Sequence, residues 1–186
     1  MKFYCLFLLI LIGTGSYSKS HFDAQVCFEK GFEYNELELF NDTVSSINSN
    51  GINLNFFYRR DIFKEKLDLV IGLGVRCYDL EATLSNTSLK GSFVKPQFSL
   101  GVNYLLTKVS SVALRFQTEN VKEFIEFESQ ATDLLSYSAL IEYDYRLVEK
   151  LSVLINYKQG FYPMNDIYRM ENPSSVISIG FKYNLI

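Results

Sequence analysis

Apolar and polar residues alternate along almost the whole chain after residue 22. In the first such stretch Ala24, Val26 and Phe28 alternate with Gln25 and Cys27. A period of two is typical of a β-strand with one apolar and one polar face. The pattern predicts eight strands, over residues 24–34, 52–59, 67–76, 94–104, 112–117, 135–145, 151–160 and 177–185.

The predicted connections alternate in length along the chain. Long connections cover residues 35–50, 80–91, 120–133 and 162–174, and short ones cover 60–66, 105–110 and 146–150. An even number of strands, with long loops at one end and tight turns at the other, is the layout of a bacterial outer-membrane barrel. No helical period or change of composition indicates a second domain, so one barrel domain is expected over residues 19–186.

Alternation alone leaves open whether the apolar face points into the barrel or into lipid. The interior of an eight-stranded barrel is narrow, and the apolar face carries too many large residues to fit there, whereas the other face carries glycines and small polar residues. Tyrosines also cluster at the predicted short-turn end, as in an aromatic girdle. These tyrosines are Tyr58, Tyr104, Tyr143, Tyr145 and Tyr183. We therefore expect the apolar face to contact the bilayer.

The N-terminus has the pattern of a secretory signal peptide. Lys2 precedes an apolar run over residues 3–12, and Ser16 and Ser18 are the small residues expected before a cleavage site. Residues 1–18 are therefore expected to be removed on export. The exported chain keeps Cys27 and Cys77, which the alternation places on opposite faces of non-neighbouring strands, so we expect two free thiols.

The C-terminal strand resembles the sorting signature of outer-membrane barrels, although the chain ends in Ile186 instead of the commoner aromatic residue. The matching positions are Ser178, Gly180, Tyr183 and Leu185. With the signal peptide and the eight strands, the chain resembles the small outer-membrane barrels of the OmpA transmembrane domain, OmpX and OmpW type. The resemblance implies an all-β, eight-stranded antiparallel up-and-down transmembrane barrel. It also implies a bacterial outer-membrane location, recognition by the barrel-assembly machinery, surrounding outer-membrane lipid and a monomeric state.

The predicted polar face carries equal numbers of acidic and basic residues. They are Glu29, Glu33, Asp68, Glu119, Glu142 and Asp144, and Arg59, Arg76, Lys95, Arg115, Lys158 and Lys182. Unpaired buried charges are costly, so these groups should pair. Heights along the strands favour the pairs Arg115–Glu142 and Glu29–Lys182, with Arg76 and Lys95 as further members. The pairs favour a structural plug, and an ion pathway or gate is the alternative.

Composition excludes several function classes. A formal net charge of −3 gives no basic footprint for nucleic acid. The single histidine, His21, precedes the first predicted strand, so no catalytic residue, cofactor or metal site is expected. The long connections carry acidic and aromatic residues, which favours an envelope-structural or surface-interaction role with a possible extracellular ligand. The alternatives are a narrow channel for small solutes or ions and a soluble, secreted lipocalin-like carrier of a lipid-like ligand.

Overall fold

A computed structural model describes residues 19–33, 37–39, 42–63, 65–84, 88–121, 134–161 and 175–185. The predicted signal peptide lies outside these residues, as do most of the predicted connections 120–133 and 162–174. The strands are β1 (Ser20–Glu33), β2 (Leu37–Leu39), β3 (Asp42–Phe63), β4 (Leu67–Leu84), β5 (Ser88–Leu105), β6 (Ser110–Val121), β7 (Leu134–Arg146), β8 (Leu151–Phe161) and β9 (Ser175–Asn184). Among the described residues, no helix is long and apolar enough to span a membrane.

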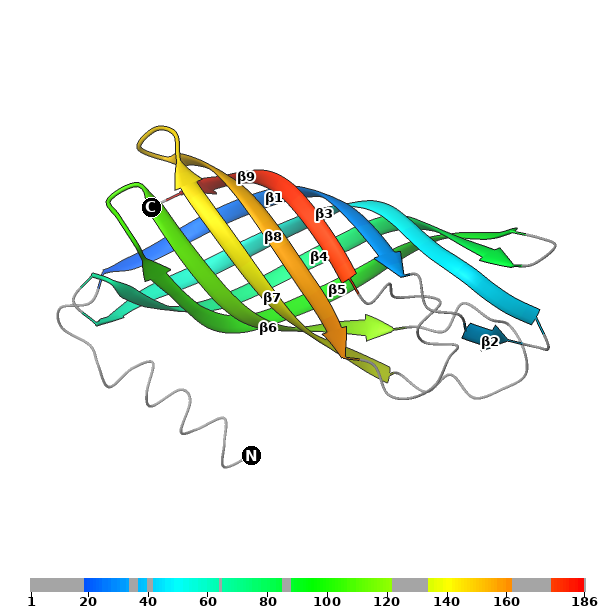
Figure 1. Ribbon diagram of the computed structural model, residues 1–186. Coiled ribbons are helices and arrows are strands. Elements are labelled where there is room, and N and C mark those ends of the chain that lie inside the picture. The colour runs from blue at the N-terminus through cyan, green and yellow to red at the C-terminus, as the bar shows by residue number, and fades with distance from the viewer. Residues whose placement is uncertain are drawn as a thin grey trace, which may run out of the picture.

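Eight of these strands close into an antiparallel barrel (Figure 1). Neighbours in sequence pair with each other from β3 to β9, and β1 closes the barrel by pairing with β9 on one side and β3 on the other. The short β2 pairs only with the start of β3, where Glu38 lies opposite Thr43. The predicted eight-stranded up-and-down barrel is therefore confirmed.

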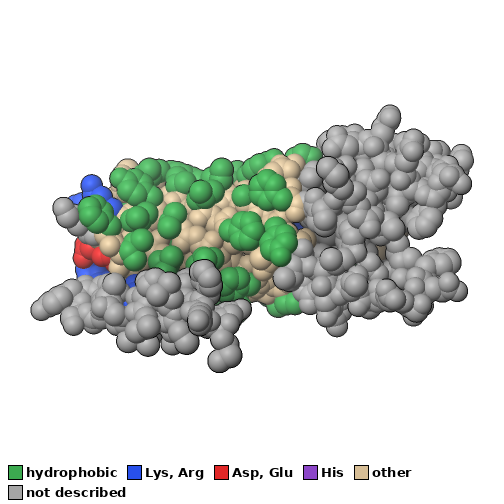
Figure 2. Space-filling model, turned by 90° about the horizontal axis from the view of Figure 1, so that it is seen from below, with side chains coloured by type: hydrophobic (Ala, Val, Ile, Leu, Met, Phe, Trp, Pro, Cys, Tyr) green, Lys and Arg blue, Asp and Glu red, His purple; other side chains and the backbone are tan. Residues whose placement is uncertain are grey.

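The apolar face of the strands points outward, as predicted. Phe28, Leu73 and Val94 are 60%, 63% and 71% exposed, whereas Arg76 and Glu142 are each only 1% exposed inside the barrel. Figure 2 shows hydrophobic side chains spread over the barrel wall. This arrangement is the reverse of a soluble barrel, whose apolar side chains lie inside and whose polar ones face water. It fits a wall surrounded by lipid.

The structure corrects two of the predicted long connections. Residues 42–50 and most of 80–91 belong to strands, because β3 begins at Asp42, β4 reaches Leu84 and β5 starts at Ser88. The outward side chains here are polar, with Asn50 opposite Asp79 and Glu81 opposite Lys90. The strands therefore continue beyond the apolar wall with a polar outer face, and the alternation of apolar and polar residues ends before the strands do.

The cysteines lie as expected. Cys27 is buried inside the barrel and Cys77 is exposed on the outer face, and both are free thiols. They belong to β1 and β4, which do not pair with each other.

Candidate functional site

The barrel interior is the candidate site because it holds most of the buried charge. Of the side chains that the structure describes, six acidic and six basic ones point inward. They are Asp23, Glu29, Asp68, Glu119, Glu142 and Asp144, and Arg59, Arg76, Lys95, Arg115, Lys158 and Lys182. The equal numbers let the interior stay neutral overall while each charge finds a partner.

The first cluster lies toward the long-connection end and is centred on Glu119. Lys158 Nζ lies 2.5 Å from Glu119 Oε1, and Arg76 Nη1 lies 3.4 Å from Glu119 Oε2. Arg76 Nε also lies 2.5 Å from Glu29 Oε2. Gln117 donates to Glu119 Oε1 at 3.1 Å. Four strands, β1, β4, β6 and β8, thus contribute charges to this Glu119 cluster.

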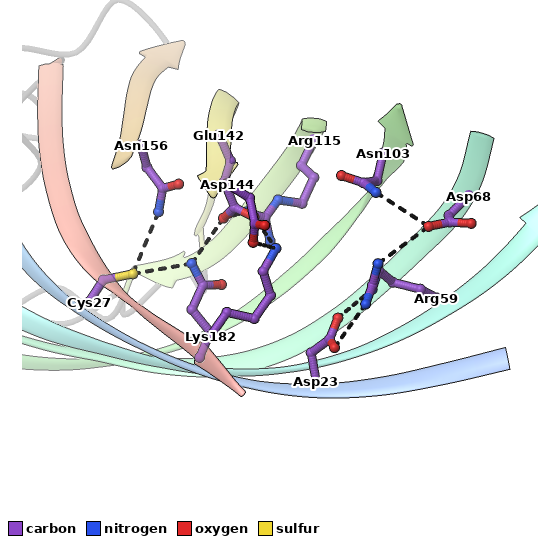
Figure 3. A network of polar contacts seen from close by, with 11 residues as sticks. Asp23, Cys27, Arg59, Asp68, Asn103, Arg115, Glu142, Asp144, Asn156 and Lys182 are labelled. Atoms are coloured by element: carbon purple, nitrogen blue, oxygen red, sulfur yellow. Dashed lines mark hydrogen bonds and ion pairs between the residues drawn. The ribbon is translucent and has the colours of Figure 1, made fainter. Parts of the chain in front are cut away.

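A second cluster surrounds Glu142 in the middle of the barrel (Figure 3). The Arg115 guanidinium contacts the Glu142 carboxylate, which also accepts from Gln25 Nε2 and Lys182 Nζ, each at 2.9 Å. Lys182 Nζ lies 2.6 Å from Asp144 Oδ2 as well. The Glu142 cluster therefore bridges the closing seam between β1 and β9 and the opposite wall of β6 and β7.

The third cluster lies toward the short-turn end and is centred on Arg59. Arg59 forms a two-point ion pair with Asp23, whose second contact, Nη2 to Oδ1, is 3.0 Å. Its Nη1 lies 3.4 Å from Asp68 Oδ2, which also accepts from Asn103 Nδ2 at 3.3 Å. Two-point pairing fixes the plane of the guanidinium across the barrel.

Apolar side chains complete the filling between the clusters. The Phe57 ring, 4% exposed, lies under the Arg115 guanidinium at 4.4 Å. It covers Gly72 on β4, where a Cβ would lie 2.4 Å from the ring, so the glycine makes room for it. The remaining cavity beside Phe57, Val70 and Ala113 measures about 10 Å³. That is about the volume of one water molecule.

Aromatic and aliphatic side chains cover the Glu119 cluster on the long-connection side. The Arg76 guanidinium lies 4.2 Å from the Tyr78 ring, which stacks on Phe93 at 5.2 Å. Lys95 Nζ lies 5.3 Å from the Phe93 ring. Ile47, Leu80 and Val176 are buried on the same inner face. This layer separates the charged interior from the end that carries the long connections.

At the short-turn end the interior opens into a cavity of about 330 Å³. Its walls include Asp23, Arg59 and His21, and turn residues such as Arg146 and Lys150. Most of the lining residues are charged or polar. We call this cavity the vestibule.

An ion pair between exposed side chains borders the vestibule. Lys19 Nζ lies 2.6 Å from Glu65 Oε1. This hydrogen bond and the lysine's charge lower the pKa of the Glu65 carboxyl, and the carboxylate raises the pKa of Lys19.

The structure brings together one of the two predicted ion pairs. Arg115 and Glu142 are in contact. The other prediction is wrong in its partners, because Glu29 pairs with Arg76 and Lys182 pairs with Glu142 and Asp144. In the β1–β9 register, Lys182 lies opposite Gln25, four residues from Glu29. The predicted first strand starts at residue 24, whereas β1 starts at Ser20. The predicted heights of the β1 residues along the barrel are therefore displaced relative to those of β9.

Asp23 and Phe57 belong to the site but are not among the residues predicted for it. Asp23 is 1% exposed and holds Arg59, and extending the period of two by one residue toward the N-terminus would have placed it on the inner face. Phe57 is apolar on the polar face, so alternation gave no signal for it. The side chain of Glu33, assigned to the same face, lies outside the described part of the structure.

The four positions of the sorting signature divide between the two faces of β9. Ser178 and Gly180 are buried on the inner face, and Tyr183 and Leu185 are 47% and 45% exposed on the outer face. Gly180 lies opposite Cys27, and a Cβ there would be 2.1 Å from the Val26 carbonyl oxygen. Close packing against β1 thus requires glycine at this position.

No metal site is evident in the residues described. Among them, no group of three or more His, Cys, Asp or Glu side chains could hold a metal ion. His21 borders the vestibule, away from both free thiols.

Comparison with solved structures identifies the fold. Two structures of the outer membrane protein Ail from Yersinia pestis share 12% identity and a TM-score of 0.50 with this chain. The alignment with the Ail structure in a bilayer nanodisc covers 90% of this chain and 100% of the Ail chain. The chain has the fold of the small eight-stranded outer-membrane barrels. At this identity the likeness shows the fold alone.

Another solved structure, the outer membrane protein OprG from Pseudomonas aeruginosa, is similar at 14% identity and a TM-score of 0.49. The alignment covers 91% of this chain and 98% of OprG. Comparisons with protein-family models and with curated protein sequences gave no match.

Proposed function

We propose that this chain is a monomeric bacterial outer-membrane protein, exported with cleavage of residues 1–18, whose filled barrel is a scaffold for contacts at the cell surface. The observation that carries the proposal is the combination of an apolar outer wall with an interior filled by three ion-pair clusters. An apolar wall supports a position in lipid. A filled interior favours a structural role over transport.

The long-connection end supports a role in surface interaction. The structure of Ail with the heparin analogue sucrose octasulfate shows a polyanion bound to a barrel of this fold. In this chain, residues 34–50, 79–92, 120–133 and 162–174 hold 11 acidic and 3 basic residues. Like charges repel, so a polysulfated sugar is a poor ligand here, and a cationic partner is the better fit.

The proposal includes no catalytic activity, cofactor or bound metal. Nucleophilic catalysis needs a base beside a Ser or Cys side chain. His21 lies at the vestibule, whereas Cys27 is buried deeper in β1 and Cys77 is on the outer wall. The partners we propose are outer-membrane lipid, the barrel-assembly machinery acting on the β9 signature, and an extracellular ligand.

A narrow channel for small solutes or ions is the second candidate. Two observations favour it. Lys182 has two carboxylate partners, Glu142 and Asp144, between which it could exchange, and the vestibule of about 330 Å³ leads toward them. Opening such a path would require the Arg115–Glu142 contact to separate and Phe57 to move.

Conductance of refolded protein in a planar bilayer separates these two functions. Folding and insertion are first verified by heat-dependent gel mobility. If the barrel is a scaffold, the wild type gives no current. Replacing Glu142 or Arg115 by Ala should also give no current, as long as the barrel still folds. A steady current that rises in either variant would establish the channel and reject the scaffold.

Cell fractionation tests the proposed location. The full chain, expressed with its N-terminal segment, is expected in the outer-membrane fraction after carbonate extraction and with residues 1–18 removed. Recovery in the soluble fraction would overturn the proposal.

A further inference from the structure

The three short turns combine exposed apolar side chains with basic ones. Beyond the barrel wall, Phe63, Leu106 and Val148 are 57%, 51% and 61% exposed. Each belongs to a different turn or to the strand end next to it, and the described turn residues are 65–66, 106–109 and 147–150. Exposed apolar side chains at turn tips are costly in water, and their repetition on all three turns indicates a surface that they contact.

Basic side chains outnumber acidic ones at the same end. Apart from the inward side chains of the three clusters, the described residues here include six basic and three acidic ones. They are Lys19, Arg60, Lys66, Lys108, Arg146 and Lys150, and Asp61, Glu65 and Glu149. All three acidic ones line the vestibule, together with three of the basic ones, Lys19, Arg146 and Lys150. Two of the acidic groups have local partners, since Glu65 pairs with Lys19 and Asp61 accepts from the backbone of Phe63. Figure 2 shows basic and acidic side chains side by side at this end of the molecule.

A ring of tyrosines marks where the apolar wall meets these turns. Tyr104, Tyr145 and Tyr183 are each 47% exposed on the outer face near the short turns. Tyr58 packs against Phe22 with ring centroids 5.2 Å apart. Tyrosine prefers the boundary between hydrocarbon and headgroups, so the turns follow at headgroup depth.

The opposite edge of the apolar wall has a different charge pattern. There the outward row consists of Lys30, Asn50, Asp79 and Ser92, with one cation and one anion. Lys30 Nζ donates to Asn50 at 3.0 Å, and Ser92 donates to Asp79 at 2.6 Å. Unlike the short-turn edge, these four described positions present no excess of positive charge to a membrane surface.

We propose that the short-turn end binds the headgroups of anionic phospholipids in the leaflet that it faces. The apolar turn side chains lie at the acyl boundary, and lysine stems extend along them to place ammonium groups at the lipid phosphates. The inference rests on the proposed position of the barrel in a bilayer. The lipid class follows from charge complementarity, since zwitterionic headgroups offer no net attraction to a basic rim.

The test measures lipid selectivity of the inserted protein. Refolded full-length protein is placed in phosphatidylcholine vesicles with spin-labelled phosphatidylglycerol or phosphatidylcholine, and the relative association constant of the two labelled lipids is determined. We expect several-fold preference for phosphatidylglycerol at low salt. It should vanish in about 1 M NaCl, where the Debye length is about 3 Å.

Two double variants localise the effect. Lys66→Gln with Lys108→Gln removes two exposed turn lysines that do not line the vestibule. This double variant should reduce the preference by at least half, because one lysine near an anionic surface contributes up to about a fivefold change. The control, Lys30→Gln with Lys90→Gln, removes the same charge at the other edge and should leave the preference unchanged.

Three results overturn the proposal. They are an inserted wild type without preference, equal effects of the two double variants, and a preference that survives high salt. If the short-turn end instead binds a periplasmic protein, the inserted wild type would show no lipid preference. Failure of folded protein to insert into any vesicle, judged by gel mobility, would instead contradict the proposed membrane function, so the two failures are distinguishable.

Discussion

The Glu142 cluster allows a quantitative prediction about buried charge. Glu142→Gln keeps the size of the side chain and removes its charge. Arg115, 4% exposed, then loses its carboxylate partner, whereas Lys182 keeps Asp144 at 2.6 Å. Removing one partner of a buried ion pair costs about 3–5 kcal/mol. We expect a loss of this size in the free energy of unfolding.

Exposed Glu81 provides a control with the same substitution. Glu81 pairs with Lys90 at 3.0 Å, and both side chains are about half exposed or more, at 49% and 69%. Glu81→Gln should therefore cost less than about 1 kcal/mol. Adding Arg115→Met to Glu142→Gln removes the unpaired cation and should restore much of the lost stability.

The assay is equilibrium unfolding by urea from lipid vesicles, followed by tyrosine fluorescence and by heat-dependent gel mobility. The midpoint and slope together give the free energy of unfolding. Two results would refute the reasoning. One is a cost of Glu142→Gln no greater than that of Glu81→Gln. The other is a double variant whose cost equals the sum of its single ones.

Three further predictions use the same unfolding assay. Leu73→Arg, in the middle of the outward apolar wall, should cost roughly 2–4 kcal/mol, and a cost near zero would mean that this wall is not in lipid. Phe57→Ala should cost about 3–5 kcal/mol yet give no current, because the Glu119 and Glu142 clusters still fill the barrel; an open pore in this variant would show that Phe57 alone closes it. Glu65 has a positive φ of 57°, so Glu65→Gly should be more stable than Glu65→Ala by about 1 kcal/mol; equal stabilities would show that the turn stores no strain.

Much of the barrel follows from the sequence because its outer wall alternates strictly. Along this wall, as at Leu73 and Val94, an apolar residue at every second position marks both the strand and its outer face. Beyond the apolar wall this pattern ends. The pairs Asn50–Asp79 and Glu81–Lys90 are polar on the outside, so the extensions of β3, β4 and β5 were predicted as loops.

Ion pairs could be predicted only between strands whose register could also be predicted. Arg115 lies on β6, which starts at a short turn, and Glu142 lies on the adjacent β7, which ends at one. Both turns are at the same end of the barrel, so counting from them gives the relative heights of the two residues. Glu29 and Lys182 lie on opposite sides of the closing seam, four residues apart in the β1–β9 register. No turn precedes β1, so nothing in the pattern fixed its start, and both partners of this predicted pair differ in the structure. Contacts across the interior, such as Lys158 with Glu119, depend on strand tilt and barrel closure, which single-strand patterns do not contain.

A depth measurement with a single tryptophan tests most directly whether the apolar face lies in lipid. The chain has no tryptophan, so Leu73→Trp introduces the only one, on the middle of the outer wall. Ser92→Trp is the control in the polar row at the edge. In vesicles of lipids brominated on the acyl chains, we predict strong quenching and blue-shifted emission for Leu73→Trp and little quenching for Ser92→Trp. Unquenched, red-shifted emission from folded Leu73→Trp would contradict a barrel whose apolar face lies in the bilayer.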